Sequence, residues 1–177
     1  MNYKMMGKFV AQTLFVEALF MLPALGISLF CRDAMAVRGF LITEAVLLAV
    51  QAVLFFLCKG APRVFGATEG LVCVSISWIV MSLIGCLPFC LSGEIPKYVD
   101  AFFEMVSGFT TTGASVVANV EGLSRGILYW RSFSHWVGGM GVLVFLLAIA
   151  PGGERGTGFT MHLLDRKSTR LNSSHTS

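Results

Sequence analysis

Residues 98–115 read YVDAFFEMVSGFTTTGAS, and this stretch decides how the rest of the chain is interpreted. Its first part, Tyr98–Gly108, has the apolar density of a helix of about two to three turns, which is too short to cross a bilayer. Asp100 near the start suits the positive end of a helix dipole. The sequence therefore predicts a half-length helix that ends at Gly108.

A threonine-rich loop, Phe109–Ser115, follows the short helix. β-Branched threonines favour extended backbone, and Gly113 after them can adopt a positive φ angle. Such a strand can turn successive carbonyl oxygens towards one axis, where a ring of carbonyls replaces the water around a potassium ion. Thr-Thr-Gly alone is more typical of an exposed turn, but its position between two full-length apolar segments favours an ion-binding loop.

Four apolar segments of about 20 residues accompany this stretch, and about 20 helical residues span a bilayer core. The composition agrees, because 55% of the residues are hydrophobic and only 13% are charged, about half the usual charged share. The first segment is longer than the apolar core of a signal peptide and is expected to be retained. The sequence predicts an all-α membrane protein. Its predicted spans are Phe9–Phe30, Val37–Leu57, Leu71–Leu91 and Trp130–Ala150.

The predicted organisation has two parts and a tail. Residues 1–63 form an N-terminal two-span hairpin, and residues 64–164 form one unit of span, pore helix, filter loop and span. Residues 165–177 are polar, rich in Ser and Thr and without periodicity. We interpret them as a non-native or disordered tail outside the fold.

The distribution of basic residues predicts cytoplasmic termini, because Lys and Arg favour the cytoplasmic side and an even number of spans places both termini together. The net charge of +3 is too small to indicate nucleic acid as a partner. The five cysteines contain no C-x-x-C pair that would indicate a metal site or a disulfide frame. In this orientation the basic residues inside are Lys4, Lys8, Lys59, Arg63, Arg155, Arg166, Lys167 and Arg170, and those outside are Arg32, Arg38, Lys97, Arg125 and Arg131.

Three glutamates lie at or near membrane depth, where an ionisable side chain is a functional candidate. Glu104 in the pore helix is expected to support the filter from behind by hydrogen bonding. For Glu17 and Glu44 a packing or interface role is favoured, and a pair between the first two spans is the alternative.

Small residues on the last span predict close helix packing. Ser134 and Gly138 form a small-xxx-small pair, and Gly139 and Gly141 extend the same smooth surface.

Aromatic residues of the last span, Tyr129, Trp130 and Trp136, suit a belt at the membrane interface. Ser134 and His135 are adjacent, so they point to different helix faces, and no acid follows at a suitable spacing. Hydrolase chemistry is therefore not expected, and no enzyme activity is predicted.

Three motifs together carry a family resemblance: Phe103-Glu104, Ser107–Ser115, and Trp130-Arg131-Ser132 running into Trp136–Gly141. Their order resembles the first pore unit of the TrkH/KtrB superfamily of bacterial potassium uptake proteins. The first two spans, with Glu17 and Pro23, are similar to the N-terminal hairpin that TrkH has and KtrB lacks. The resemblance covers residues 1 to about 164.

The resemblance implies a potassium translocation subunit with four covalently linked span–loop–span repeats around one pore, of which this chain contains the first as an N-terminal fragment. It implies K⁺ as the transported ion, no organic cofactor, and a multi-pass location in the bacterial inner membrane. The implied partners are lipid, the remaining repeats, a second copy in a homodimer, and a cytosolic nucleotide-binding regulatory subunit. The implied filter residues are Thr110, Thr111, Thr112, Gly113 and Ala114, with Thr111 and Thr112 as K⁺ ligands.

Two alternatives stay open. One is a short cation channel that assembles as a homotetramer, and the other is a non-conducting membrane interaction protein whose loop merely packs. In each case the backbone of Thr110–Ser115 cannot face lipid, because each unsatisfied group there costs several kcal/mol. A lone Gly113 in place of a Gly-x-Gly filter predicts looser discrimination between K⁺ and Na⁺.

A cysteine-accessibility scan tests the predicted orientation. Single cysteines near Arg32 and Glu94 are expected to react with an impermeant thiol reagent from outside the cell, and cysteines near Lys59 and Glu154 only from within. External labelling near Lys59 would reverse the topology.

Overall fold

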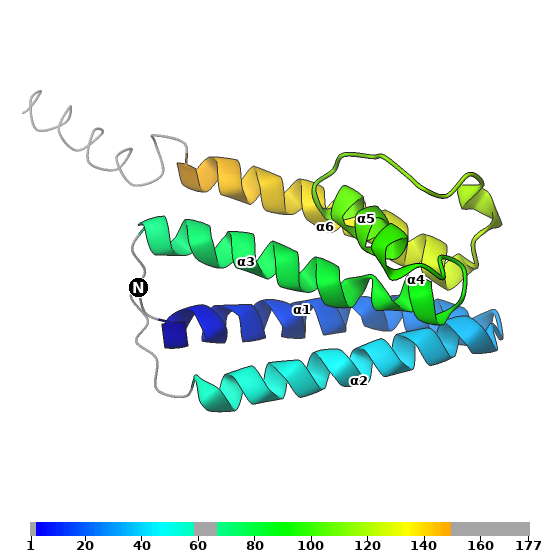
Figure 1. Ribbon diagram of the computed structural model, residues 1–177, viewed down its shortest axis with the longest axis horizontal. Helices are drawn as coiled ribbons and strands as arrows, with labels where there is room; N and C mark the ends of the chain where they lie inside the picture. Colours follow the sequence, from blue (N-terminus) through cyan, green and yellow to red (C-terminus); the bar gives the residue numbers. More distant parts are fainter. Residues whose placement is uncertain (1–2, 59–66, 150–177) are drawn as a thin grey trace, which may run out of the picture. The chain divides into compact units, whose positions relative to one another are not determined.

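The computed structural model describes residues 3–58 and 67–149, and these residues form helices, turns and loops without a β-strand. The chain divides into two compact units, Met1–Gly139 and Met140–Ser177, and every contact described below lies within the first. Figure 1 shows α1, α2 and α3 running side by side. The elements in chain order are α1 (Tyr3–Phe30), α2 (Ala34–Leu57), α3 (Ala67–Gly85), α4 (Leu87–Leu91), α5 (Tyr98–Phe109), the 3₁₀ helix η1 (Val120–Gly122) and α6 (Arg125–Ile149).

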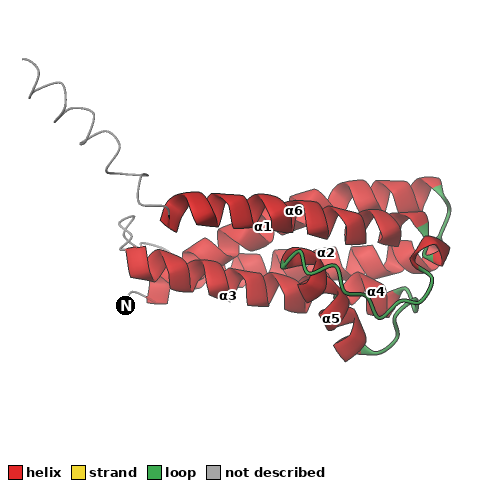
Figure 2. Ribbon diagram, turned by 90° about the horizontal axis from the view of Figure 1, so that it is seen from above, coloured by secondary structure: helices red, strands yellow, loops and turns green. Residues whose placement is uncertain are grey.

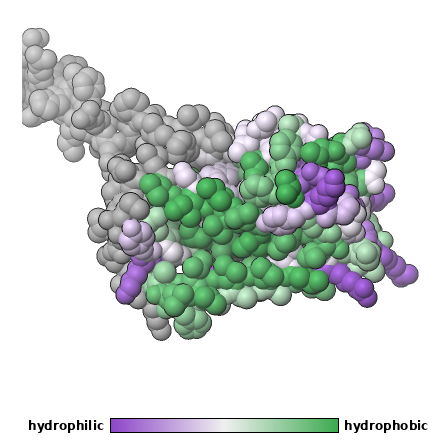
Figure 3. Space-filling view, in the orientation of Figure 1, coloured by the Kyte–Doolittle hydropathy of each residue, from purple (hydrophilic) through white to green (hydrophobic). Residues whose placement is uncertain are grey.

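The helices confirm the predicted class of all-α membrane protein. Three stretches are long and apolar enough to cross a membrane: Tyr3–Phe30, Ala34–Leu57 and Val72–Leu91. Figure 3 shows hydrophobic side chains covering much of the helical face in view, with hydrophilic ones gathered near the helix ends.

Some of the predicted boundaries fall on residues outside the described part of the chain. α6 covers most of the fourth predicted span, whose last residue, Ala150, lies outside it. The fourth span therefore stays a prediction. The predicted boundary at residues 63–64 and the predicted tail, residues 165–177, also lie outside it.

A short capped turn joins α1 to α2 and makes them a hairpin. Asp33 precedes α2, and its Oδ1 accepts hydrogen bonds from the backbone N–H groups of Met35 (3.2 Å) and Ala36 (3.1 Å). These bonds satisfy two of the donors that a helix start leaves free. Between the two helices, fully buried apolar side chains form the core, including Leu14, Met21, Phe40 and Leu47.

The third span is broken into α3 and α4 near Pro88. Proline has no N–H group and cannot continue the hydrogen-bond ladder of a helix. Side chains from later elements satisfy the carbonyl groups around the break. The Tyr98 hydroxyl donates to the Leu83 carbonyl (2.8 Å), and the Trp130 indole N–H donates to the Gly85 carbonyl (2.9 Å). The break therefore fixes where α5 and α6 attach to the third span.

The position of Trp130 corrects the prediction of an interfacial aromatic belt. Trp130 is only 1% exposed and lies in the core, whereas Trp136 is 56% exposed. Residue type alone does not tell which face of a helix is buried, and the free carbonyl of Gly85 gives a buried indole the partner that it needs.

Replacing Trp130 with phenylalanine tests this anchor. Trp130→Phe keeps a ring but leaves the buried Gly85 carbonyl without its donor, so we expect a loss of about 1–3 kcal/mol of stability. Trp136→Phe is the matched control and should change stability by less than about 0.5 kcal/mol. Titration of the purified chain with a denaturing detergent, followed by helical circular dichroism, measures both. Equal losses would mean that the hydrogen bond is unimportant.

Candidate ion-binding loop

The end of α5 is closed by two backbone hydrogen bonds. The N–H group of Thr111 donates to the Gly108 carbonyl and that of Thr112 to the Ser107 carbonyl, each at 3.0 Å. Thr111 has a φ angle of 56°. This is the Schellman pattern of a helix C-terminus, in which the residue with positive φ is usually glycine. α5 therefore ends at Phe109, one position beyond the predicted end at Gly108.

The backbone of the threonine run differs in part from the predicted extended strand. Thr110 caps the helix with φ −84° and ψ 0°, and Thr111 is left-handed, so extended backbone cannot begin before Thr112. A left-handed conformation costs a residue with a Cβ about 1–2 kcal/mol. The two hydrogen bonds at the helix end offset that cost. The β-propensity of threonine predicts an extended strand because it takes no account of these hydrogen bonds. Gly113 has a φ angle of 75°, and its predicted positive φ is confirmed.

Hydrogen bonds within the loop use the threonine hydroxyls but leave several carbonyls free. The Thr110 hydroxyl donates to the Val106 carbonyl (2.7 Å), and the Thr111 hydroxyl donates to the Thr110 carbonyl (2.7 Å). The Ser107 hydroxyl donates to the Ala114 carbonyl at 2.5 Å. Among the described residues, none donates a hydrogen bond to the carbonyls of Thr111, Thr112 or Gly113, and the loop is exposed.

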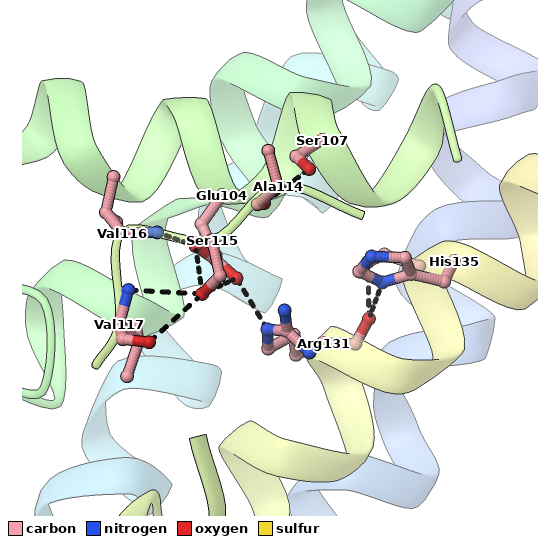
Figure 4. Close-up of polar contacts among 9 residues, drawn as sticks. Glu104, Ser107, Ala114, Ser115, Val116, Val117, Arg131 and His135 are labelled. Atoms are coloured by element: carbon pink, nitrogen blue, oxygen red, sulfur yellow. Dashed lines mark hydrogen bonds and ion pairs between the residues drawn. The ribbon is translucent and has the colours of Figure 1, made fainter. Parts of the chain in front are cut away.

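Glu104 ties the loop to α5 from behind (Figure 4). This side chain is 1% exposed. Its carboxylate accepts hydrogen bonds from the Ser115 hydroxyl (3.0 and 3.1 Å) and from the Val116 backbone N–H group (3.0 Å). The Arg131 Nε–H group donates to Glu104 Oε1 at 2.5 Å. These hydrogen bonds and the ion pair replace the water contacts that a buried carboxylate loses. Its role in supporting an ion filter stays a prediction.

Arg131 is the member of this cluster that sequence reasoning missed. The sequence places it among the basic residues outside the membrane and in the Trp130-Arg131-Ser132 motif, but gives it no acidic partner. An acid at membrane depth is usually paired with a base, and this rule pointed to a partner for Glu104. The distance of 27 residues between the two along the chain hid the pairing.

The small residues of α6 lie against the C-terminal end of α5. A Cβ atom on Gly138 would lie 2.8 Å from the Phe109 carbonyl carbon and 2.9 Å from the Gly108 oxygen. A Cβ on Gly108 would in turn lie 3.2 Å from the Ser134 Cβ. The helix that packs on this pair is thus α5.

The other two predicted packing residues contribute less to this contact. A Cβ on Gly139 would come no closer than 3.9 Å to its neighbour, the Thr111 Cγ2 atom. Gly141 belongs to the second compact unit.

The donor atoms near the loop are oxygens of the backbone and of hydroxyl groups. The described residues contain no group of three or more His, Cys, Asp or Glu side chains that could hold a metal ion. The Ser134 hydroxyl and the His135 Nδ1 atom both bind the Arg131 carbonyl, at 2.6 and 2.9 Å, rather than each other. Ser134 and His135 therefore do not form a hydrogen-bonded pair in the described part of the chain.

The fold and the loop together define a class: an all-α, multi-pass membrane protein with a half-length helix and an irregular loop between apolar helices. Residues 37–176 match the family model of TrkH, described as a cation transport protein, and the chain belongs to this family. The family consists of transport proteins rather than enzymes.

The similar proteins are named as potassium uptake proteins of Trk systems. The potassium uptake protein TrkH of Halomonas elongata is 32% identical over 152 residues, which are 85% of this chain and 31% of that protein. TrkH of Salmonella typhimurium is 39% identical over 132 residues, or 73% and 27% of the two chains. TrkG of Escherichia coli K12 is 33% identical over 135 residues, or 76% and 28%. The chain thus spans about a third or less of the length of these curated relatives.

The Glu104–Arg131 pair can be tested through stability. Glu104→Gln leaves the guanidinium of Arg131 without its counter-charge, and breaking a buried pair in this way costs about 3–5 kcal/mol. Glu121→Gln, at an exposed acid of η1, is the control and should cost less than about 0.5 kcal/mol. Detergent denaturation of the purified chain measures both.

The double variant Glu104→Gln/Arg131→Gln separates charge from packing. The double variant should be more stable than Glu104→Gln alone, because it also removes the unpaired charge of the Arg131 guanidinium. If wild type and Glu104→Gln are equally stable, the Glu104–Arg131 pair does not contribute to the stability of the fold.

Proposed function

We propose that this chain supplies one segment of the selectivity filter in a bacterial potassium uptake protein. The observation that carries the proposal is a set of three carbonyls in an exposed loop, those of Thr111, Thr112 and Gly113, which accept no hydrogen bond from the described residues and follow a half-length helix. A cation that loses its water needs such oxygens. In this role Thr111 and Thr112 bind K⁺, and Thr110 and Ala114 complete the segment.

The end of α5 favours a cation at the same place. A helix carries about half a negative charge at its C-terminus, and α5 ends at Phe109, directly before the free carbonyls. The exposed loop cannot lie in lipid, because its free backbone groups would be unsatisfied. An ion, water or neighbouring protein must meet them.

Glu104 and Arg131 support the filter segment in this proposal. The bonds from Glu104 to Ser115 and Val116 hold the loop immediately after the filter residues. Arg131 in turn fixes Glu104 to α6. A carbonyl ring discriminates between ions only if its oxygens keep their positions, and this network restrains one side of the loop.

The complete pore requires more protein than this segment contributes. One loop provides about a quarter of a ring of carbonyls. The matched region is only 31% and 27% of the length of two of the potassium uptake proteins named above. We propose that further repeats complete the filter, that the full protein is a homodimer in the bacterial inner membrane with cytoplasmic termini, and that a cytosolic nucleotide-binding subunit regulates it. K⁺ is the transported ion.

Gly113→Ser in the full-length protein that contains this segment tests the filter. No other atom lies within 4 Å of a Cβ at this position, so the substitution acts by straining the positive φ angle of 75°. The strained backbone must reorient a filter carbonyl, and we expect the preference for potassium over sodium to fall while membrane insertion is kept. Uptake of both ions in a potassium-uptake-deficient strain measures this.

Gly93→Ser is a matched control, because Gly93 also has a positive φ angle (82°) and open space around its Cβ but lies in the loop before α5. It should leave ion selectivity unchanged. If Gly113→Ser leaves selectivity unchanged as well, the loop is not the filter.

A further inference from the structure

Glu17 of α1 is a buried acid that the proposed function does not use. The side chain is 1% exposed. Both of its carboxyl oxygens lack a hydrogen-bond partner among the described residues. A buried carboxylate without a partner carries a large desolvation cost, so the structure must compensate for this group in another way.

The carboxyl group of Glu17 is packed against the break in the third span. A Cβ on Gly85 would collide with Glu17 Oε1 and would lie 2.8 Å from the Met105 Cε atom of α5. The absence of a side chain at Gly85 therefore makes the space that the carboxyl fills. The apolar methyl of Met105 closes the other side of this space.

The titratable groups that face Glu17 offer no positive charge. Glu44 of α2 and the thiol of Cys86, between α3 and α4, are the described groups that interact with it electrostatically. α5 contributes Met105, and α6 contributes the neutral Trp130, whose indole binds the Gly85 carbonyl. Among the described residues, the groups that act electrostatically on Glu17 are thus an acid and a thiol, and neither can balance a negative charge on its carboxyl group.

The ligand that fits this place is a proton. The described residues contain no group of three acidic, cysteine or histidine side chains that could hold a metal ion. The close approach of Gly85 and Met105 further argues against a hydrated ion. A proton needs one oxygen and no added volume, and buried carboxyls in membrane proteins commonly serve as proton sites.

We propose that Glu17 is a proton-binding site of the N-terminal hairpin. Binding of the proton forms one O–H bond on Glu17 and neutralises the carboxylate, whose charge changes from −1 to zero. Glu44 is only partly buried, and it is the acid that acts electrostatically on Glu17. In this proposal Glu17 has a function beyond packing.

The site lies where the hairpin meets the support of the filter loop. Glu17 touches Gly85, the Gly85 carbonyl holds Trp130, and the next residue, Arg131, binds Glu104. Loss of the proton would place a negative charge next to Gly85, and the contacts that lead from Gly85 to Glu104 would have to adjust to it. This coupling rests on the proposed function, whereas the proton site itself does not.

Infrared spectroscopy of the full-length protein that contains this segment, in lipid nanodiscs, tests the site. A protonated carboxyl group in an apolar environment gives a separate C=O stretching band. We expect this band in the wild type, its loss in Glu17→Gln, a shift in Glu44→Gln, and no change in Glu121→Gln. A band that is absent in the wild type, or kept in Glu17→Gln, would overturn the proposal.

A second measurement uses the unaltered protein, in case Glu17→Gln does not fold. Dicyclohexylcarbodiimide enters membranes and adds to protonated carboxyl groups, and mass spectrometry locates the adduct. Glu17 should be modified, and less so as the pH rises, while exposed Glu121 stays unmodified. No adduct on Glu17 at any pH would contradict the site. Neither measurement depends on ion transport, so their failure is distinct from a failure of the Gly113→Ser selectivity test.

Discussion

The arrangement of the candidate site depends on one buried carboxylate, that of Glu104. A charge at this depth is tolerated only if protein groups replace the water that it loses. Two segments provide these groups to the glutamate of α5: the loop with Ser115 and Val116, and α6 with Arg131. The need to satisfy one carboxylate therefore joins a short helix to the loop that follows it and to a long helix further along the chain.

The same requirement, that buried polar groups be paired, explains the third span and the helix end. Pro88 interrupts the third span, and side chains of Tyr98 and Trp130 reach the carbonyls near the break. At the end of α5, Thr111 accepts an unfavourable φ angle so that two backbone hydrogen bonds can close the helix. In both places the hydrogen bonding of backbone groups outweighs the conformational preference of single residues. The first attaches the start of α5 to the third span, and the second closes the end of α5.

The N-terminal hairpin is packed tightly on the later elements of the first compact unit. A Cβ on Gly126, at the start of α6, would lie 2.9 Å from the Ala24 carbonyl of α1. The rings of Phe20 and Phe133 meet edge to face at 5.2 Å between centroids. In Figure 2 the loop after α5, drawn in green, runs from the end of α5 to the start of α6. The hairpin thus packs against α6, the helix that follows the loop.

The sequence by itself determined the membrane class, the first three spans, the half-length helix and the positive φ angle of Gly113, because these follow from apolar length and from properties of single residues. Only the tertiary structure showed that Arg131 binds Glu104, that Trp130 is buried and that Thr111 is left-handed. Each of these features depends on a partner distant in the chain or on competition between a local preference and hydrogen bonds elsewhere. Residue type and spacing carry no information on such partners, because the chain must fold before the partners meet.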